Sequence, residues 1–478
     1  MSVQLKYEGG TIAITAPQHA ESLPLAVSLQ SWVKWDARSQ TYRALAFRYY
    51  ELLQILKSER IPFEDRVLNL LPSPSLDPDT FASDSDSPPV IELRDYQQEA
   101  LERWLTDGQG RGTVELPTGA GKTIIALGAI ARLKCATFIV VPTLDLVEQW
   151  KRVLSQSGFE PIGELTGQEK QLEAITVATY DSAYIHADKF GNRFPLIVFD
   201  EVHHLPSPGY RHIAEFFASP YRLGLTATYE REDDLHEVLS ELLGGVIFEV
   251  HVEELAGTHL SRYALERIYV DLTPEEREDY DKAQDVFQGY LKKRRIRIRH
   301  PRDFEKLVYR SGGDSEAWRA IRARHQAVQI AFNAKHKLDA LRTLLDTHRG
   351  DRIIIFTRFN DLVYRISQEF FIPCITYKTG REERREVLEG FRDGVYPAIA
   401  SSQVLDEGVD VPEANVGILL SGTGSSREFI QRLGRLLRPR EGKQAILYEI
   451  VSRGTGEEQT ASRRKRKLRS KSKSKKES

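Results

Sequence analysis

The sequence predicts an α/β protein with parallel sheets in two large domains, preceded by a small mixed domain and carrying a helical, basic insertion. Short apolar runs recur at the length of strands buried on both faces of a parallel sheet, at 136–141, 175–180, 194–199 and 223–228. Another strand-like segment breaks into a glycine-rich loop at 114–123 that continues into an apolar helix. A length of 478 residues suggests about three domains, each able to bury its own core.

The loop from Val114 to Thr123 has the composition of a phosphate-binding loop. Gly119 and Gly121 allow consecutive backbone N–H groups to point into one hollow, and the following helix adds its positive N-terminal end. Lys122 is then placed to reach the β- and γ-phosphates of a nucleotide, and the Thr123 hydroxyl to bind Mg²⁺.

An acidic pair supplies the second half of the predicted ATP site. The loop departs from the strict phosphate-loop pattern at Leu116, where that pattern has glycine, so alone it also fits an ordinary strand-to-helix turn. The apolar run 194–199, however, ends in Asp200-Glu201. A carboxylate at the carboxyl end of a parallel strand lies where α/β folds bind ligands. We therefore expect Asp200 to hold the same Mg²⁺ as Thr123, and Glu201 to deprotonate the attacking water.

Gln97 lies upstream of the loop, at the start of a predicted helix that runs through Trp104. Its amide can donate to and accept from the edge of an adenine ring. The residues predicted to contact ATP in this half of the chain are Arg94, Gln97, Pro117, Thr118, Gly119, Ala120, Gly121, Lys122 and Thr123.

Charge and cysteine content limit the function further. The formal net charge is −2, but residues 463–478 contain ten Lys/Arg and one Glu, a net of +9, so residues 1–462 sum to −11. Nucleic-acid binding by the body must therefore depend on local basic surfaces. Cys135 and Cys374, the only two cysteines, exclude a disulfide framework and a four-cysteine zinc site.

The sequence gives little indication of export or membrane insertion, and a nuclear-address interpretation of the basic tail is not favoured, because such tails also occur without that role. It shows no signal peptide and no apolar run near the ~20 residues of a membrane span. We expect a soluble, intracellular protein, cytoplasmic or, in a prokaryote, associated with the nucleoid.

The first 71 residues predict a small separate domain. Two strands, 3–7 and 11–14, are expected to form a hairpin at Gly9-Gly10, with a helix at 49–59. Aromatic and cationic residues mix over 42–50, as on single-strand binding platforms, although ordinary half-buried aromatics of a small domain have the same pattern. An acidic linker rich in Pro and Ser follows at 72–90.

Threonines recur where predicted strands end, at Thr143, Thr179, Thr226 and Thr228. Hydroxyl groups along one rim of a sheet suit contacts to the phosphates of nucleic acid, which fix position without reading sequence. Together with Pro142 and His203, these residues are the predicted nucleic-acid-binding or coupling residues of the first large domain.

These motifs, in this order, resemble the first motor domain of superfamily 2 helicases, a RecA-like domain. The resemblance continues downstream with a strand at 352–357. The segment 407–412, which contains Gly408 and Asp410, is similar to the fifth motif of the family, and 431–438, which begins at Gln431, matches its sixth. The resemblance implies a second RecA-like domain and adds Gly408, Asp410 and Gln431 to the ATP-binding residues.

The sixth motif predicts how the second domain takes part in hydrolysis. Arg435 and Arg438 are three residues apart and share one face of a helix. Reaching the γ-phosphate from the second domain, they would act as arginine fingers, a role worth roughly 10³–10⁵ in rate. Hydrolysis would then depend on closure of the two domains.

Two further features resemble XPB-type helicases, the xeroderma pigmentosum group B family, and the first 70 residues, with Trp35-Asp36 and Tyr42-Arg43 before a helix, resemble the small damage-recognition domain of its shorter archaeal or bacterial members. Arg231, Glu232 and Asp233 follow Thr-Ala-Thr directly, where the family has a triplet implicated in opening the duplex. The helix-rich stretch 272–333 resembles the thumb-like insertion of the family. Its basic run, 292–299, is the candidate for gripping phosphates, with Lys292, Lys293, Arg294 and Arg295 as the predicted contacts, although a solvated charged helix has the same composition.

The resulting prediction is a monomeric, ATP- and Mg²⁺-dependent DNA helicase that moves 3′ to 5′ and opens duplexes in repair or transcription, with a nuclease or repair factor as partner. Two alternatives stay open, a double-stranded DNA translocase that does not separate strands and a DNA-binding ATP switch. The predicted parts are 1–71 (damage-recognition-like), 72–90 (linker), 91–255 (first motor domain), 256–455 (second motor domain, insertion at about 272–333) and 456–478 (basic tail).

Overall fold

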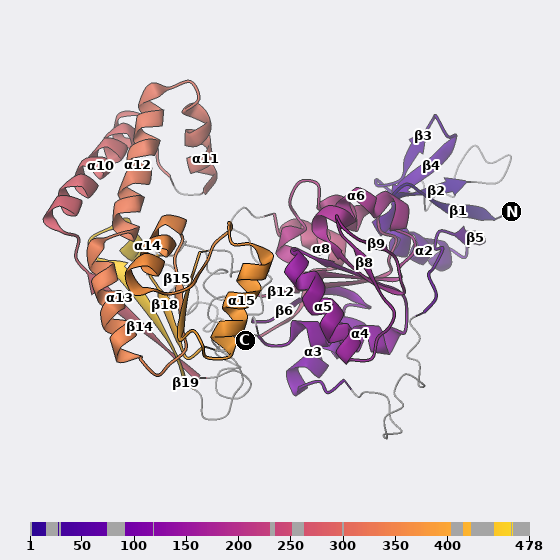
Figure 1. The fold of residues 1–478 in the computed structure, drawn as a ribbon. Coiled ribbons are helices and arrows are strands. Elements are labelled where there is room, and N and C mark those ends of the chain that lie inside the picture. Colours follow the sequence, from indigo (N-terminus) through magenta and orange to yellow (C-terminus); the bar gives the residue numbers. More distant parts are fainter. Residues whose placement is uncertain are drawn as a thin grey trace, which may run out of the picture. The chain divides into compact units, whose positions relative to one another are not determined.

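The structure, a computed structural model, describes residues 2–15, 27, 30–73, 91–117, 119–229, 235–250, 262–298, 301–402, 414–421, 444–459 and 461. The chain forms two compact units, Met1–Leu116 with Gly121–Val250, and Pro117–Ala120 with His251–Ser478 (Figure 1). Several predicted site residues lie outside the described residues: Thr118, Arg231, Glu232, Asp233, Gly408, Asp410, Gln431, Arg435 and Arg438.

The first unit begins with a five-stranded sheet of order β3-β4-β2-β1-β5. The predicted hairpin is confirmed, because β1 and β2 pair antiparallel and Gly9 and Gly10 turn between them with φ of 55° and 86°. Apolar residues on alternate positions of β1 pack against α2, which closes the small core. The elements are β1 (Val3–Glu8), β2 (Thr11–Thr15), β3 (Lys34–Asp36), β4 (Thr41–Leu45), η1 (Ala46–Arg48), α2 (Tyr49–Ser58) and β5 (Phe63–Arg66).

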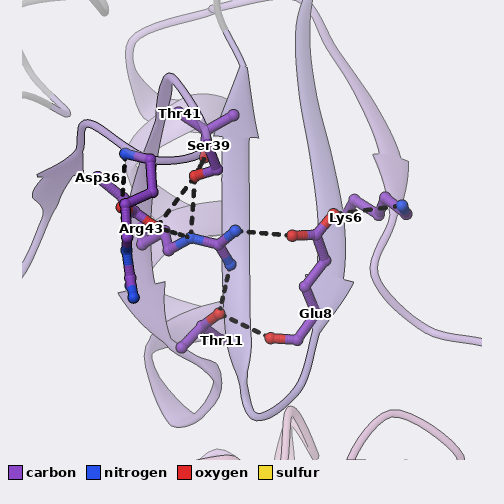
Figure 2. Close-up of polar contacts among 8 residues, drawn as sticks. Lys6, Glu8, Thr11, Asp36, Ser39, Thr41 and Arg43 are labelled. Atoms are coloured by element: carbon purple, nitrogen blue, oxygen red, sulfur yellow. Dashed lines mark hydrogen bonds and ion pairs between the residues drawn. The ribbon is translucent and has the colours of Figure 1, made fainter.

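Arg43 is held inside a polar network on this sheet (Figure 2). Its guanidinium donates to Glu8 Oε2 at 2.8 Å, Asp36 Oδ2 at 3.0 Å and Thr11 Oγ1 at 2.9 Å, three residues that the strand pairing brings to its side. The neighbouring ring of Trp35 is 51% exposed. The hydrogen-bonding groups of Arg43 are therefore occupied by residues of its own domain. The exposed ring of Trp35 is accessible to a ligand.

The small sheet packs directly on the rest of the first unit. The Tyr7 hydroxyl lies 3.0 Å from the carbonyl oxygen of Phe216 and 3.1 Å from that of Ala187. The Asn192 side chain donates to Val67 O at 3.0 Å. Gly10 lies so close to the ring of Phe216 that a Cβ there would be 2.5 Å from it. These contacts fasten the small sheet to the helices of the larger one.

The larger sheet of the first unit has eight strands in the order β13-β6-β12-β11-β7-β10-β8-β9. All neighbours pair parallel except β8 and β9. The strands are β6 (Arg111–Glu115), β7 (Thr137–Val141), β8 (Ile162–Leu165), β9 (Lys170–Gln171), β10 (Ile175–Thr179), β11 (Leu196–Asp200), β12 (Tyr221–Thr226) and β13 (Val246–Glu249). The helices are α3 (Asp95–Thr106), α4 (Lys122–Leu133), α5 (Leu144–Gln156), α6 (Tyr180–Phe190), α7 (Arg211–Phe216) and α8 (Glu237–Leu243), with a short η3 (Val202–His204).

The second unit contains a six-stranded parallel sheet of order β14-β19-β18-β15-β17-β16. The predicted α/β fold with parallel sheets in both motor domains is therefore confirmed. The strands are β14 (Arg262–Val270), β15 (Ile353–Phe356), β16 (Cys374–Ile375), β17 (Ala398–Ser401), β18 (Val416–Leu419) and β19 (Gln444–Ser452), and the helices beside them are α13 (Lys335–Thr347), α14 (Asn360–Phe370) and α15 (Arg381–Arg392).

The predicted helical insertion is formed by α10 (Pro274–Lys293), α11 (Pro301–Arg310) and α12 (Ser315–Phe332) (Figure 1). Thr273 begins α10 with a capping box to Glu276, and Asp314 caps α12. Buried alanines along α12 let it pack closely on α10. Among the described helices, none is long and apolar enough to span a membrane.

Candidate nucleotide and nucleic-acid site

The phosphate loop connects β6 to α4 in the first large sheet. Gly119 and Gly121 have φ of 85° and 75°, in the region that favours glycine. A Cβ on Gly121 would lie 2.4 Å from Gln97 Nε2, so glycine is also required for space. The Lys122 ammonium donates to Leu116 O at 3.3 Å. The Lys122 side chain therefore spans the loop, and it would bind a phosphate held there.

Gln97 is buried against this loop. Its Nε2 donates to Gly121 O at 3.4 Å, and its Oε1 accepts from the Arg94 backbone N–H at 2.9 Å. The amide therefore ties the start of α3 to the start of α4. Recognition of adenine by Gln97 stays a prediction.

Asp200 ends the central strand β11 and is only 7% exposed. Its Oδ1 accepts from the Glu201 backbone N–H at 3.0 Å, and its Oδ2 from Trp150 Nε1 at 2.8 Å. Burial, followed by the nearby charge of Glu201, raises the pKa of Asp200 to about 6, while the ammonium of Lys122 acts in the opposite direction. A desolvated carboxylate with oxygen lone pairs available suits a hard cation such as Mg²⁺.

Glu201 has a left-handed backbone, with φ of 47° and ψ of 54°. Such a conformation is unfavourable for a residue with a Cβ and is found at functional sites. Glu201 follows directly on the last residue of β11 and begins the short η3. Glu201 Oε2 is buried without a hydrogen bond among the described residues, and lies 3.4 Å from His203 Nδ1. A polar atom in this position is suited to bind a water molecule.

A buried network connects the acidic pair to the end of β12. His203 Nδ1 lies 3.2 Å from Thr226 Oγ1, which donates to Thr228 O at 2.9 Å. All three side chains are buried, so their geometry favours the coupling role over direct contact with phosphates.

Thr143 and Thr179 occupy equivalent positions on the rim of the sheet. Each is the N-cap of a helix, and its hydroxyl accepts a backbone N–H of the first turn at 3.3 Å. Both residues are half-buried, as is Pro142. They place the N-terminal ends of α5 and α6 at the same edge as Asp200, a position that suits phosphate binding.

Sequence reasoning missed two residues of this site. Trp150, on α5, donates to the Asp200 carboxylate, and the Tyr180 hydroxyl donates to Asp200 O at 3.2 Å. Both side chains are buried. The only sequence signal was a tryptophan on the apolar face of the helix that follows Pro142-Thr143, which does not by itself indicate a carboxylate partner.

In the basic run of the insertion, some cations form ion pairs within the insertion and others are exposed to solvent. The Lys293 ammonium donates to Glu316 Oε1 at 2.8 Å, and Arg294 lies within 3.5 Å of Asp314 and Glu316. Lys292 and Arg295 are exposed and make no ion pair among the described residues. Within 292–295, Lys292 and Arg295 are therefore the cations available to bind phosphates.

Family models match three consecutive parts of the chain. Residues 5–67 match the xeroderma pigmentosum group B helicase damage recognition domain, and residues 90–231 match the type III restriction enzyme, res subunit. Residues 315–474 match the ERCC3/RAD25/XPB C-terminal helicase. The "DNA 3'-5' translocase XPB2" of Sulfurisphaera tokodaii is 44% identical over 449 residues, 94% of this chain and 99% of that protein. The chain belongs to the XPB helicase family.

Other XPB relatives are more distant and longer. The "DNA 3'-5' helicase XPB" of Mycobacterium tuberculosis is 29% identical, over 78% of this chain and 62% of that protein. The "General transcription and DNA repair factor IIH helicase/translocase subunit XPB" of Schizosaccharomyces pombe is 28% identical, over 79% of this chain and 46% of that protein. The XPB resemblance inferred from the motifs is thus confirmed.

Proposed function

We propose that this XPB-family protein is an ATP-dependent DNA helicase or translocase that moves 3′ to 5′ along one strand and opens duplexes in repair or transcription. The observation that carries this proposal is the shared edge of the first large sheet. The phosphate loop, the Asp200-Glu201 pair and the capped ends of α5 and α6 all lie at the carboxyl ends of neighbouring parallel strands.

The residues of this edge fit Mg²⁺-ATP. The positive φ angles of Gly119 and Gly121 allow the backbone curvature of a phosphate-binding loop, and Asp200 is a buried carboxylate that a cation would stabilise. Thr123 and Asp200 would hold Mg²⁺, which supplies charge neutralisation on the phosphates. Lys122 binds the β- and γ-phosphates, and Glu201 orients the attacking water and accepts its proton.

The second unit would complete hydrolysis and contribute to DNA binding. Arg435 and Arg438 would place positive charge on the developing γ-phosphate, with Gln431, Gly408 and Asp410 beside the nucleotide. Lys292 and Arg295 would bind the DNA backbone from the insertion. Arg231, Glu232 and Asp233 would separate the strands at the fork.

The first experiment is the steady-state ATPase rate with matched single-stranded DNA, blunt duplex DNA and RNA. Stimulation chiefly by single-stranded DNA supports a strand-tracking helicase. Glu201→Gln should reduce the stimulated rate about 10²–10⁴-fold while ATP still binds. A rate that no nucleic acid changes, or that survives Glu201→Gln, would contradict this function.

A second candidate is translocation on duplex DNA without strand separation, because the Sulfurisphaera tokodaii relative is named a translocase. This function predicts stimulation by blunt duplex DNA that is equal to or greater than that by single strands. It also predicts that replacing Arg231, Glu232 and Asp233 together by alanine leaves the ATPase rate and movement on duplex DNA unchanged. A helicase would lose unwinding with the same replacement.

The proposed setting is inside the cell, on DNA and with a repair factor or nuclease as partner. The Schizosaccharomyces pombe relative is named as a subunit of a general transcription and DNA repair factor, so assembly with other proteins is a property of that protein. We propose a monomeric motor that acquires any cutting activity from a partner. Affinity purification of the full chain from its cell extract would capture bound proteins. Size-exclusion chromatography of the captured complex and of the chain alone would then test this arrangement.

A further inference from the structure

We propose that Trp150 is a positioning residue that couples nucleic-acid binding at the start of α5 to the carboxylate of Asp200. Trp150 is 1% exposed, and its indole N–H donates to Asp200 Oδ2 at 2.8 Å. Thr143 begins the same helix at the rim of the sheet. The inference rests on the proposed function, because it requires both an ATP site and a strand bound near Thr143.

The choice of hydrogen-bond acceptor separates Trp150 from an ordinary core tryptophan. A buried indole N–H needs an acceptor, and a backbone carbonyl is sufficient for that purpose. Trp104 in the same unit is equally buried and donates to Arg222 O at 3.0 Å. Trp150 instead donates to the side chain predicted to hold Mg²⁺. Its N–H therefore acts on a functional group.

The two oxygens of Asp200 are fixed by different parts of the chain. Oδ1 accepts from the adjacent Glu201 N–H, which moves with the strand end itself. Oδ2 accepts from Trp150, which moves with α5. A shift of α5 relative to β11 would therefore rotate the carboxylate plane. Trp150 lies two helical turns from Thr143, roughly 10 Å along a rigid element, so a displacement at the rim is transmitted.

A second helix makes a parallel connection. Tyr180 is the first residue of α6, directly after Thr179, and its hydroxyl donates to Asp200 O at 3.2 Å. The helices that begin at the two rim threonines thus both donate to Asp200, one to its side chain and one to its backbone. Phosphates bound at the two helix starts would act on the same residue.

The test is Trp150→Phe in the full chain, with Trp104→Phe as the matched control. Trp150→Phe should reduce the ATPase rate stimulated by single-stranded DNA about tenfold, as expected for one lost hydrogen bond to a charged group, and should reduce the basal rate less. The Mg²⁺ concentration for half-maximal rate should rise several-fold. Trp104→Phe should change neither quantity, although it removes an equally buried N–H bond.

A double-mutant cycle tests the coupling itself. If Trp150 carries the signal from the rim, Thr143→Val and Trp150→Phe together should lower stimulation no more than the stronger single change. Additive losses would overturn the coupling. Tyr180→Phe removes only a hydroxyl and provides the same cycle with Thr179→Val, should Trp150→Phe fail to fold in a thermal melt.

The outcomes separate this inference from the proposed function. A wild-type rate that DNA does not stimulate overturns the proposed function, and the coupling with it. A stimulated wild type with an equally stimulated Trp150→Phe, at unchanged Mg²⁺ requirement, overturns this inference alone.

Discussion

The carboxyl group of Asp200 destabilises the folded protein at neutral pH. Its pKa is raised from 3.8 to about 6, so the folded state binds this proton more tightly than the unfolded chain. The stabilising contribution of the protonated group is present below about pH 4 and is lost as the pH rises through 6. At pH 7.5 the ionised group costs about 3 kcal/mol unless a cation is bound, since each pKa unit corresponds to about 1.4 kcal/mol.

Asp200→Asn should therefore stabilise the protein at pH 7.5 in the absence of Mg²⁺ and nucleotide, while abolishing hydrolysis. We expect a melting temperature higher by roughly 5 °C at pH 7.5, and a clearly smaller gain at pH 4.5. The measurement is differential scanning calorimetry in buffers of matched ionic strength. A gain that is the same at both pH values would contradict a cost from ionisation.

Among the elements, the hairpin of β1 and β2 provides a sharp test of how the small domain is attached. Gly10→Ala would place a methyl group 2.5 Å from the ring of Phe216, at a φ of 86°, and should lower stability by about 1–3 kcal/mol. Gly9→Ala is the matched control, because Gly9 also has a positive φ but no atom within 4 Å of the added Cβ. Thermal unfolding and limited proteolysis of both variants measure the difference.

The insertion helices permit a second comparison at this scale. Lys292→Ala should weaken DNA binding and lower the slope of log affinity against log salt by about 1, since one phosphate contact is lost. Lys293→Ala should have a smaller effect, because Lys293 is paired with Glu316. Fluorescence anisotropy over a salt series gives both slopes. Equal losses would mean that the Lys293 ion pair opens on binding DNA.

At the scale of the whole molecule, positive charge is concentrated in the last sixteen residues of the sequence. The body sums to −11 and residues 463–478 to +9, so the basic tail should supply much of the non-specific affinity for DNA. Deleting 463–478 should weaken binding several-fold at low salt and leave the basal ATPase rate unchanged. An altered basal rate would show that the tail also acts on the motor.

The fold was predictable because its signals are local. Apolar runs of strand length and the glycine loop around Gly121 identify the first large domain, and the helix-rich composition of 272–333 identifies the insertion. The bond between Trp150 and Asp200 was not predictable, because the two residues are fifty positions apart and meet only when β11 and β7 pair. Arg43 was open to two interpretations until the pairing of β1 with β2 and of β2 with β4 placed Glu8 and Thr11 beside it.

The attachment of the small sheet has a kinematic consequence. Contacts at Tyr7, Gly10 and Val67 hold this sheet against the larger sheet and helices of the first unit. The small sheet therefore moves together with the ATP-binding part of that unit. Under the proposed function, any DNA surface contacted by the small sheet would pass it once for each advance of that motor. The distance between successive contacts would then equal the step length, and the time between them would be set by the rate of ATP turnover.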